Sequence, residues 1–528
     1  MTKRHPALVT AATSLLLATT VAQMAGCAVG PDYARPEAIP SQDFSPAPLP
    51  TETASAPGAL GAAQRFAIER DIKADWWTLF GSTDLNALIE RAFAANPSIE
   101  SARAALRIAQ ENVAAQRGAF FPSVQASYSP SRTQLAGNLG GNSPGIQGDG
   151  SVISTGQGTP ASAGGTPPFN SPVVYTFHTA QLTVGFVPDV FGGNRRQVEA
   201  LQAQADSQRL ELSAAFVTLA TNIVAATVQD ASLRRQVSLT QDMITADEAL
   251  LALTERQLRA GYSSKLDVAQ QRNALAQARA LLPPLSKQFE LNRDLLRALA
   301  GLPQDAEVPA FDLDAFRLPE ELPSALPSRI VEQRPDVRIA EEALHAATAQ
   351  VGIARAARLP QFSIDGTVGG SASHFSEMFW SSGRFFDIAL GLTQPIFDGG
   401  TLRHRERAAD AAVHQAAAQY RLAVLTAFQN IADTLHQIHA DAQELTAANE
   451  VSDTARTALD LTTRQHDRGY VSRLVLIAAE QSSLQARLGV VQARASRLDD
   501  TAALFQALGG GWWHRPEASP AAPDDAAQ

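Results

Sequence analysis

The chain carries one long pattern twice, and this internal duplication limits its possible folds more than any other feature. Asn96-Pro97 and Arg334-Pro335 are each followed, 25 residues later, by a second proline, Pro122 and Pro360. Further pairs of matching segments are Pro188–Gly193 with Pro395–Gly400, Arg259–Ser263 with Asp467–Val471, and Ala298–Gly301 with Ala507–Gly510. The sequence therefore predicts two copies of one structural unit.

Each copy is predicted to contain a helical hairpin of unusual length. No proline or glycine interrupts the 66 residues from Asn194 to Arg259, which span about 100 Å as a helix. Apolar residues recur there every seven positions, which predicts coiled-coil packing: Phe216, Ile223, Val237, Ile244, Leu251 and Leu258, with a break at Asp230. Gly261 and Gly469 are predicted to turn each long helix into a shorter returning arm, which the helical stretches at 84–119 and 328–358 would complete.

Each copy also contains two stretches with period-two alternation. In one of them Phe386, Ile388, Leu390 and Leu392 alternate with Asp387, Ala389, Gly391 and Thr393. A strand with one apolar and one small polar face meets two different solvents. We predict strands at about 119–129 and 173–189 in the first copy, and at about 360–370 and 385–397 in the second. Residues 129–172, almost entirely Gly, Ser, Thr, Pro, Asn and Gln, are predicted to form a loop.

The first 27 residues have the pattern of a secretory signal that ends in a lipid-modified cysteine. Lys3 and Arg4 precede an apolar run of about 15 residues, which is shorter than a membrane-spanning helix requires. Met24-Ala25-Gly26-Cys27 resembles a bacterial lipobox, which implies cleavage before Cys27, a diacylglycerol on its thiol and an acyl chain on its new amine. An ordinary signal peptide with an incidental cysteine is the alternative.

Composition excludes several classes of protein. The net charge of −10, without a basic patch, argues against nucleic-acid binding. A single cysteine excludes intramolecular disulfides, thiolate zinc sites and iron–sulfur clusters. No nucleophilic triad, Walker motif or zinc spacing is present, so we expect no enzyme, metal or cofactor. His436 and His439 lack a third ligand, and His466 beside Asp467 is either a solvated turn residue or a pH sensor.

Four strands per chain cannot close a membrane barrel, because the smallest bacterial outer-membrane barrels have eight. Open sheet edges are not tolerated in lipid, so the strands are expected to pair with those of other chains. Three copies would supply twelve strands, and the strand pattern alone leaves two or four copies open.

The start of the predicted mature chain, Cys27 through Pro36, closely resembles the outer-membrane efflux lipoproteins of the NodT branch of the TolC-like family. Asp75-Trp76-Trp77 and Leu299-Ala300-Gly301-Leu302-Pro303 fit the same branch, and the resemblance covers nearly the whole chain. It implies an α+β membrane protein: a homotrimer with a 12-stranded β-barrel in the outer membrane and a coiled-coil helical tunnel in the periplasm. The implied partners are outer-membrane lipid, a periplasmic adaptor and an inner-membrane pump, commonly of the resistance–nodulation–division class, that expels drugs and toxic organic compounds.

The resemblance places adaptor docking and pore closure at the two hairpin turns. The implied docking residues are Arg259, Gly261, Tyr262, Ser263, Arg468, Gly469, Tyr470 and Ser472, and the implied closing residues are Lys265, Asp267, Arg473, Leu474 and Val475. Some relatives close this tip with carboxylates in the second copy, where this chain has Val475 and Ala478. We therefore expect a pore sealed mainly by apolar contacts.

The predicted order of segments is a signal peptide (1–26), a lipid-anchored proline-rich tether (27–75), a first repeat (76–305, hairpin 193–300), a linker (306–333), a second repeat (334–511, hairpin 400–508) and a disordered tail (512–528). Three other functions remain open. An exit duct for type I protein secretion keeps the same fold. A periplasmic adaptor lipoprotein has one hairpin inside a split lipoyl domain, and a rod-like lipoprotein has no use for amphipathic strands.

Overall fold

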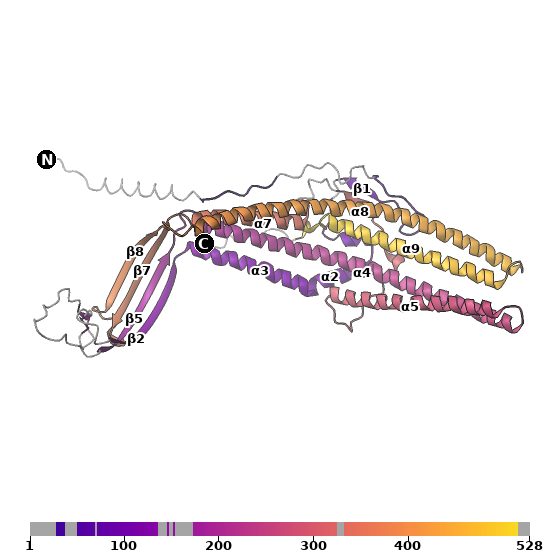
Figure 1. Cartoon of the computed structure of the whole chain (residues 1–528), viewed down its shortest axis with the longest axis horizontal. Helices are drawn as coiled ribbons and strands as arrows, with labels where there is room; N and C mark the ends of the chain where they lie inside the picture. Colours follow the sequence, from indigo (N-terminus) through magenta and orange to yellow (C-terminus); the bar gives the residue numbers. More distant parts are fainter. Residues whose placement is uncertain are drawn as a thin grey trace, which may run out of the picture. The chain divides into compact units, whose positions relative to one another are not determined.

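The computed structural model describes residues 28–36, 50–68, 71–135, 145–146, 152–153, 173–324 and 332–515 (Figure 1). Cys27 and the predicted signal peptide lie outside these residues. The chain divides into two compact units, which we call the sheet unit (1–33, 111–202 and 346–413) and the helical unit (34–110, 203–345 and 414–528).

The sheet unit contains one four-stranded antiparallel sheet. Its strands are β2 (Ser123–Leu135), β5 (Val173–Phe186), β7 (Gln361–Ala372) and β8 (Arg384–Thr393), in the order β2-β5-β7-β8 (Figure 1). The register places Leu182 of β5 opposite Val368 of β7, and Val368 opposite Phe386 of β8. Because side chains alternate along each strand, this register collects most of the apolar residues of the four strands on one face, and Phe177 and Phe385 are exceptions on the other.

The apolar face is left largely uncovered. Phe386, Ile388 and Leu390 of β8 are each more than three-quarters exposed. The opposite face carries polar side chains such as Gln125, which pairs with Thr183 in the register. Within the described residues, the outer edges of β2 and β8 have no strand partner. The sheet is therefore two-faced and open, and its exposed apolar face needs a covering that the described residues do not supply.

The strand ends differ from the predicted positions. β2 begins at Ser123, after a 3₁₀ turn (η2, Gly118–Phe120), and continues to Leu135 because its end still pairs with β5. The loop predicted from 129 therefore starts later, and it contains the short paired strands β3 (Gly145–Ile146) and β4 (Val152–Ile153). β5 and β8 end before Pro188 and Pro395, earlier than predicted, because proline has no N–H for the ladder.

The helices form two long hairpins. Their bounds are α2 (Thr83–Ala95), α3 (Pro97–Arg117), α4 (Gly193–Arg259), α5 (Lys265–Leu299), α7 (Pro335–Ala356), α8 (Thr401–Asp467) and α9 (Arg473–Ala507). In the helical unit the hairpins α4–α5 and α8–α9 run side by side with their turns at the same end (Figure 1). α4 is long and apolar enough to cross a membrane, but 67% of its most apolar window is buried within the protein, which is typical of a core helix.

The first returning helix ends against the start of another helix. The Asn96 side chain donates to the carbonyl oxygen of Leu299, at the end of α5, over 2.8 Å. The same side chain accepts from the backbone N–H of Ser98 at 2.8 Å and so caps α3. Gly301 leaves α5 with a φ of 67°, a conformation that favours glycine. α5 is therefore followed, end to end, by α3.

The second returning helix ends in the same way with different chemistry. Arg334 Nη1 donates to the carbonyl oxygen of Ala507 at 2.9 Å, and Arg334 Nη2 lies 2.7 Å from Asp336 Oδ2. Gly509, with a φ of 98°, lies so close to the Gln333 carbonyl oxygen that a Cβ would stand 2.6 Å from it. The two matching Xaa-Pro pairs of the sequence are therefore the joints that give each long helix a second partner.

Part of the predicted tether is bound to the helical unit instead of running free. Strand β1 (Arg65–Ile68) pairs in parallel with β6 (Glu321–Ser324) from the predicted linker. The fully buried Arg497 of α9 donates to the carbonyl oxygens of Leu60 and Ala62, at 3.0 and 2.7 Å. These charge-assisted bonds hold the segment before β1 against α9.

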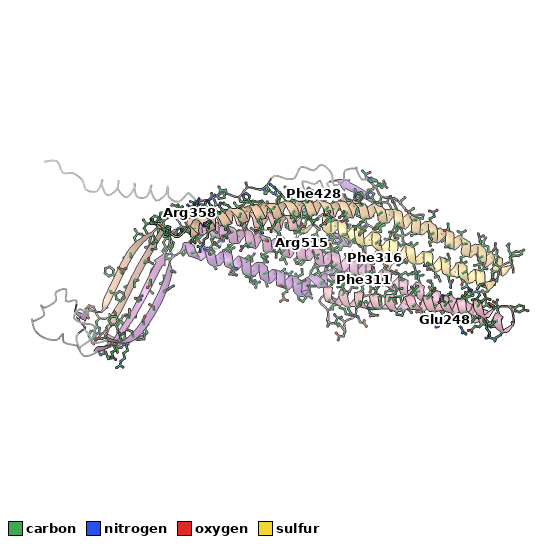
Figure 2. The ribbon with its side chains drawn as sticks, viewed as in Figure 1. Glu248, Phe311, Phe316, Arg358, Phe428 and Arg515 are labelled. Carbon is green, nitrogen blue, oxygen red and sulfur yellow. The ribbon has the colours of Figure 1, made fainter. Side chains whose placement is uncertain are left out.

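The predicted start of the disordered tail, at residue 512, is also too early in the chain. Trp512–His514 form a 3₁₀ turn in which Trp512 Nε1 donates to the Gln333 carbonyl oxygen. Arg515, which is labelled in Figure 2, lies over the rings of Phe93 and Phe216, and its guanidinium carbon is 4.4 and 4.6 Å from their centroids. Aromatic and cation–π contacts therefore hold the chain as far as Arg515.

Replacing Asn96 by Asp tests the first joint. Aspartate keeps the acceptor for Ser98 but replaces the donor to Leu299 by a carboxylate that faces a carbonyl oxygen. We expect a loss of about 2 kcal/mol in the free energy of unfolding, seen as a lower melting temperature of the purified protein. Asn273→Asp, at an exposed position of α5, is the matched control and is expected to leave the melting temperature unchanged. An equal effect of both variants would contradict the assignment.

Candidate functional site

The two hairpin turns are built by the same backbone bonds. After α4, the N–H of Gly261 donates to Leu258 at 3.1 Å and that of Tyr262 to Gln257 at 2.8 Å. After α8, Gly469 and Tyr470 make the equivalent bonds, at 2.8 and 2.9 Å. Both glycines have a positive φ, 77° and 79°. Helices end in this way when a glycine takes the left-handed conformation.

The turns present tyrosine to solvent. Tyr262 is 87% exposed and Tyr470 is 76% exposed. Among the described residues, nothing lies within 4 Å of where a Cβ would stand on Gly261 or Gly469. The glycines are therefore needed for their backbone conformation alone, and the turn surface around them is free for contacts.

The two returning helices begin differently. Asp267 and Ser264 form a capping box at the start of α5, and Asp267 also accepts from the Ser263 hydroxyl at 3.0 Å. Hydrogen bonds from the backbone and side chain of Ser264 hold the pKa of Asp267 below its usual value. Ser472 at the start of α9 makes no such side-chain bond within the described residues. Asp267 thus already has a local role in ending the first turn.

The predicted closing residues lie at this same end, without direct bonds between the two turns. Leu474 and Val475 are about half exposed, and Arg473 lies 4.0 Å from Glu480 on its own helix. No hydrogen bond or ion pair in the described part of the chain joins Lys265 or Asp267 to the second turn. His466 Nδ1 lies 3.2 Å from the Val471 carbonyl oxygen, within its own turn. The described residues of a single chain therefore leave the apolar side chains of Leu474 and Val475, at the start of α9, about half uncovered.

A buried carboxylate that sequence reasoning missed joins the two hairpins. Asp247 of α4 accepts from Gln271 of α5 at 3.2 Å and from Gln481 of α9. Burial raises the pKa of Asp247, and the two glutamine bonds oppose that rise. Asp247 lies 14 residues after Leu233, which is two heptads, and both are buried, so the seven-residue spacing of α4 indicated a position on the packed face. Nearby, Glu248 of α4, which is labelled in Figure 2, accepts from Arg279 of α5 at 2.6 Å and so links the two helices of the first hairpin.

The break in the heptad series at Asp230 has a similar explanation. Asp230 is fully buried, 3.4 Å from Arg234 Nη2 and 3.7 Å from Arg293 Nη1. Both arginines also lie over the ring of Phe289. The carboxylate replaces an apolar contact by an ion pair between α4 and α5. Losing one partner would leave a buried charge without compensation.

A second group of acids lies between α8 and α9. Asp441 is buried, and burial together with the neighbouring Asp500 carboxyl raises the pKa of Asp441 to about 7. Burial, with smaller contributions from Asp500 and Asp441, raises the pKa of Asp499 to about 8. One carboxylate oxygen of Asp499 is covered and has no hydrogen-bond partner among the described residues. These carboxyls are therefore protonated well above the pH at which free aspartate ionises.

His436 and His439 belong to no group of three or more potential metal ligands among the described residues. His436 is exposed, and the ring of His439 stacks on Phe66 at 5.3 Å. The described residues contain no group of three or more His, Cys, Asp or Glu side chains arranged to hold a metal ion.

The raised pKa of Asp499 predicts a pH dependence of stability. A carboxyl that binds its proton more tightly in the folded state stabilises the fold at low pH, and this contribution is lost as pH rises from about 4 towards 8. We expect the parent protein to melt at a lower temperature at pH 8.5 than at pH 5. Asp499→Asn should reduce that difference by about 2–5 °C, because the amide does not ionise.

Asp460→Asn, at an exposed position of α8, is the control and should melt like the parent at both values of pH. Thermal unfolding followed by circular dichroism measures the effect. If Asp499→Asn and the parent lose the same amount between pH 5 and pH 8.5, the assignment of Asp499 is wrong.

The sequence of this chain matches the profile of a known protein family. The profile of the family described as outer membrane efflux protein matches residues 88–302 and 326–510. The pyoverdine export outer membrane protein OpmQ of Pseudomonas putida is 28% identical over 438 residues, which cover 83% of this chain and 88% of that protein. The toluene efflux pump outer membrane protein TtgC of Pseudomonas putida is 28% identical over 507 residues, 95% of this chain and 96% of that protein. The solved structure of the outer-membrane channel OprN aligns with a TM-score of 0.75 and 26% identity over 92% of this chain and all of that one.

Proposed function

The chain belongs to the outer membrane efflux protein family, and we propose that it is the outer-membrane channel subunit of a tripartite efflux system. The observation that carries the proposal is the combination of two long hairpins with an open, two-faced sheet. The hairpins suit a tunnel wall, and the sheet suits a membrane wall with lipid on one side and water on the other. Such a conduit is passive, is no enzyme and takes its energy from the pump.

We propose that three chains assemble into the channel. The unpaired edges of β2 and β8 are expensive in lipid, because each exposed backbone group there lacks a partner. Pairing β2 of one chain with β8 of the next removes every edge when the ring closes. Three chains then supply a barrel of twelve strands, which exceeds the minimum of about eight.

The hairpin turns are the proposed docking surface for a periplasmic adaptor. Exposed tyrosine side chains on rigid turns are suited to contacts with a partner, because they offer a large area at a small cost in conformational entropy. Tyr262 and Tyr470 occupy equivalent places in the two turns, so a trimer presents six similar sites. Arg259, Ser263, Arg468 and Ser472 complete the proposed surface.

The N-terminal lipid anchor is also a proposal, since Cys27 lies outside the described residues. The residues that follow it are held on the sheet unit. The N–H of Val29 donates to the Phe191 carbonyl oxygen at 3.0 Å, and Asp32 accepts from Arg196 at 2.6 Å. Gly30 approaches Gly352 too closely for a Cβ. These contacts of residues 29–32 keep residue 28 beside the junction of β5 and α4. An acyl chain on Cys27 would therefore be attached at a fixed place on the sheet unit.

The proposed cargo is small molecules that a resistance–nodulation–division type pump delivers. Relatives are named for the export of pyoverdine and for the efflux of toluene, which are small molecules. Deletion of the gene should therefore raise susceptibility to drugs or solvents. Loss of a secreted protein with unchanged susceptibility would favour the alternative, an exit duct for type I protein secretion.

Mass and shape of the detergent-purified protein test the channel. We expect light scattering to give a trimer and negative-stain images to show threefold particles with a hollow axis. Intact-mass measurement of the same preparation should show a chain that starts at Cys27 and carries acyl groups, which Cys27→Ser lacks. A monomeric particle would contradict the channel, whereas an unmodified trimer would contradict only the lipid anchor.

Single-channel recording tests the proposal that apolar contacts seal the pore. Leu474→Ser and Val475→Ser place hydroxyls where apolar side chains are about half exposed in the single chain. We expect conductance in planar bilayers to rise several-fold, because water then enters the contact between chains. Leu422→Ser, exposed on α8 but distant from the turns in sequence, is the control. Unchanged conductance of both tip variants would refute the apolar seal.

A further inference from the structure

A polar cavity of about 430 Å³ lies within the helical unit. Residues of α4, α8 and α9 form three of its walls, and Pro57, Gly58 and the turn at 312–314 form the remainder. The side chain of Asn449 donates to the Pro57 carbonyl oxygen at 3.0 Å and so holds one rim in place. The cavity is therefore bounded by elements from both copies of the repeat.

Arginine is concentrated in this cavity although the chain as a whole is acidic. Four arginines line it, Arg235 from α4, Arg456 from α8, and Arg487 and Arg494 from α9. Three aspartates line it as well, Asp312, Asp314 and Asp453. The local balance is positive, against a net charge of −10 for the whole chain.

Each of the three aspartates already has an ion pair or a hydrogen bond. Asp314 lies 3.2 Å from Arg494 Nη1, and Asp453 lies 3.7 Å from Arg456 Nη2. Asp312 accepts from the backbone N–H of Asp314 at 3.2 Å. In this part of the chain, no group of three or more potential metal ligands is present. The cavity is therefore not arranged for a cation.

Three donor groups of this cavity have no acceptor among the described residues. Neither Arg235 nor Arg487 has a hydrogen bond or ion pair with any described residue. The Nε atom of Arg494 is covered from solvent and has no acceptor among the described residues. A covered donor without an acceptor is costly, and a bound ligand is one way to satisfy it. These three groups come from α4 and α9 and line one cavity.

We propose that this cavity is a binding site for a phosphate group, either as free phosphate or as part of a small phosphomonoester. Guanidinium groups present planar forks of donors that match the oxygens of phosphate, and such charge-assisted bonds are stronger than neutral ones. The bound anion would connect α4 of the first repeat to α9 of the second. This site is separate from the hairpin turns and does not depend on the proposed channel function.

Equilibrium dialysis of the detergent-purified full chain against radiolabelled inorganic phosphate tests the site. We expect saturable binding that weakens as salt is added, because the arginines are partly exposed. Arg235→Gln and Arg487→Gln should each weaken binding by about tenfold, and the double variant should bind no measurable phosphate. Arg107→Gln removes one exposed positive charge of α3 outside the cavity and should bind like the parent.

Two results would overturn the proposal. One is the absence of saturable phosphate binding by the parent chain. The other is a double variant that is folded, by circular dichroism, and binds phosphate as the parent does, because the anion would then lie elsewhere. Competition with glycerol phosphate separates the two sources. Stronger binding of the ester than of free phosphate assigns the site to a phosphomonoester, and weaker binding assigns it to free phosphate.

Discussion

The end-to-end joint between a returning helix and the helix that follows it is the interaction on which the helical unit depends. α4 and α8 run for 67 residues each, whereas α5 and α9 run for 35. A long helix is stable in water only where its apolar face is covered, so each needs a second partner. Asn96 and Arg334 provide the joint, one with an amide and the other with a guanidinium, by satisfying the last carbonyl groups of the returning helix. Each precedes a proline, whose missing N–H costs nothing at the first position of a helix.

The sheet follows a different constraint. Its register places most of the apolar residues of four strands on one face, yet the described residues neither cover this face nor pair with the outer edges of β2 and β8. In water such a surface would favour aggregation. In a membrane the same surface is stabilised by lipid, provided that the edges are paired by other chains. The sheet is thus the part of the fold that the proposed assembly would complete.

Carboxylates in the packed faces of the helices separate two physical cases. Asp230 is compensated by two arginines, and Asp247 by two glutamine amides that belong to different hairpins. Burial raises the pKa of all four carboxyls, and the rise reaches about 7 at Asp441 and about 8 at Asp499. The partners of Asp230 and Asp247 oppose the rise, whereas the neighbouring Asp500 carboxyl adds to it at Asp441 and Asp499. Asp230 and Asp247 stand where the seven-residue spacing of α4 would place apolar side chains, and their partners explain why they are tolerated.

The sequence by itself predicted the two long hairpins, the turns at Gly261 and Gly469 and the two-faced strands, because these depend on local periodicity and on glycine and proline. It also placed the candidate turn residues on equivalent positions of the two copies. Strand ends were missed by a few residues, because the partner strand decides where a ladder stops. Only the tertiary structure decided that residues 53–64 bind Arg497, that Trp512 donates to the Gln333 carbonyl oxygen, and that Asp247 joins the hairpins. It also brought Arg235, Arg487 and Arg494 to one cavity. Contacts between residues hundreds of positions apart leave no periodic trace in the chain, because they depend on which surfaces meet after the helices have packed.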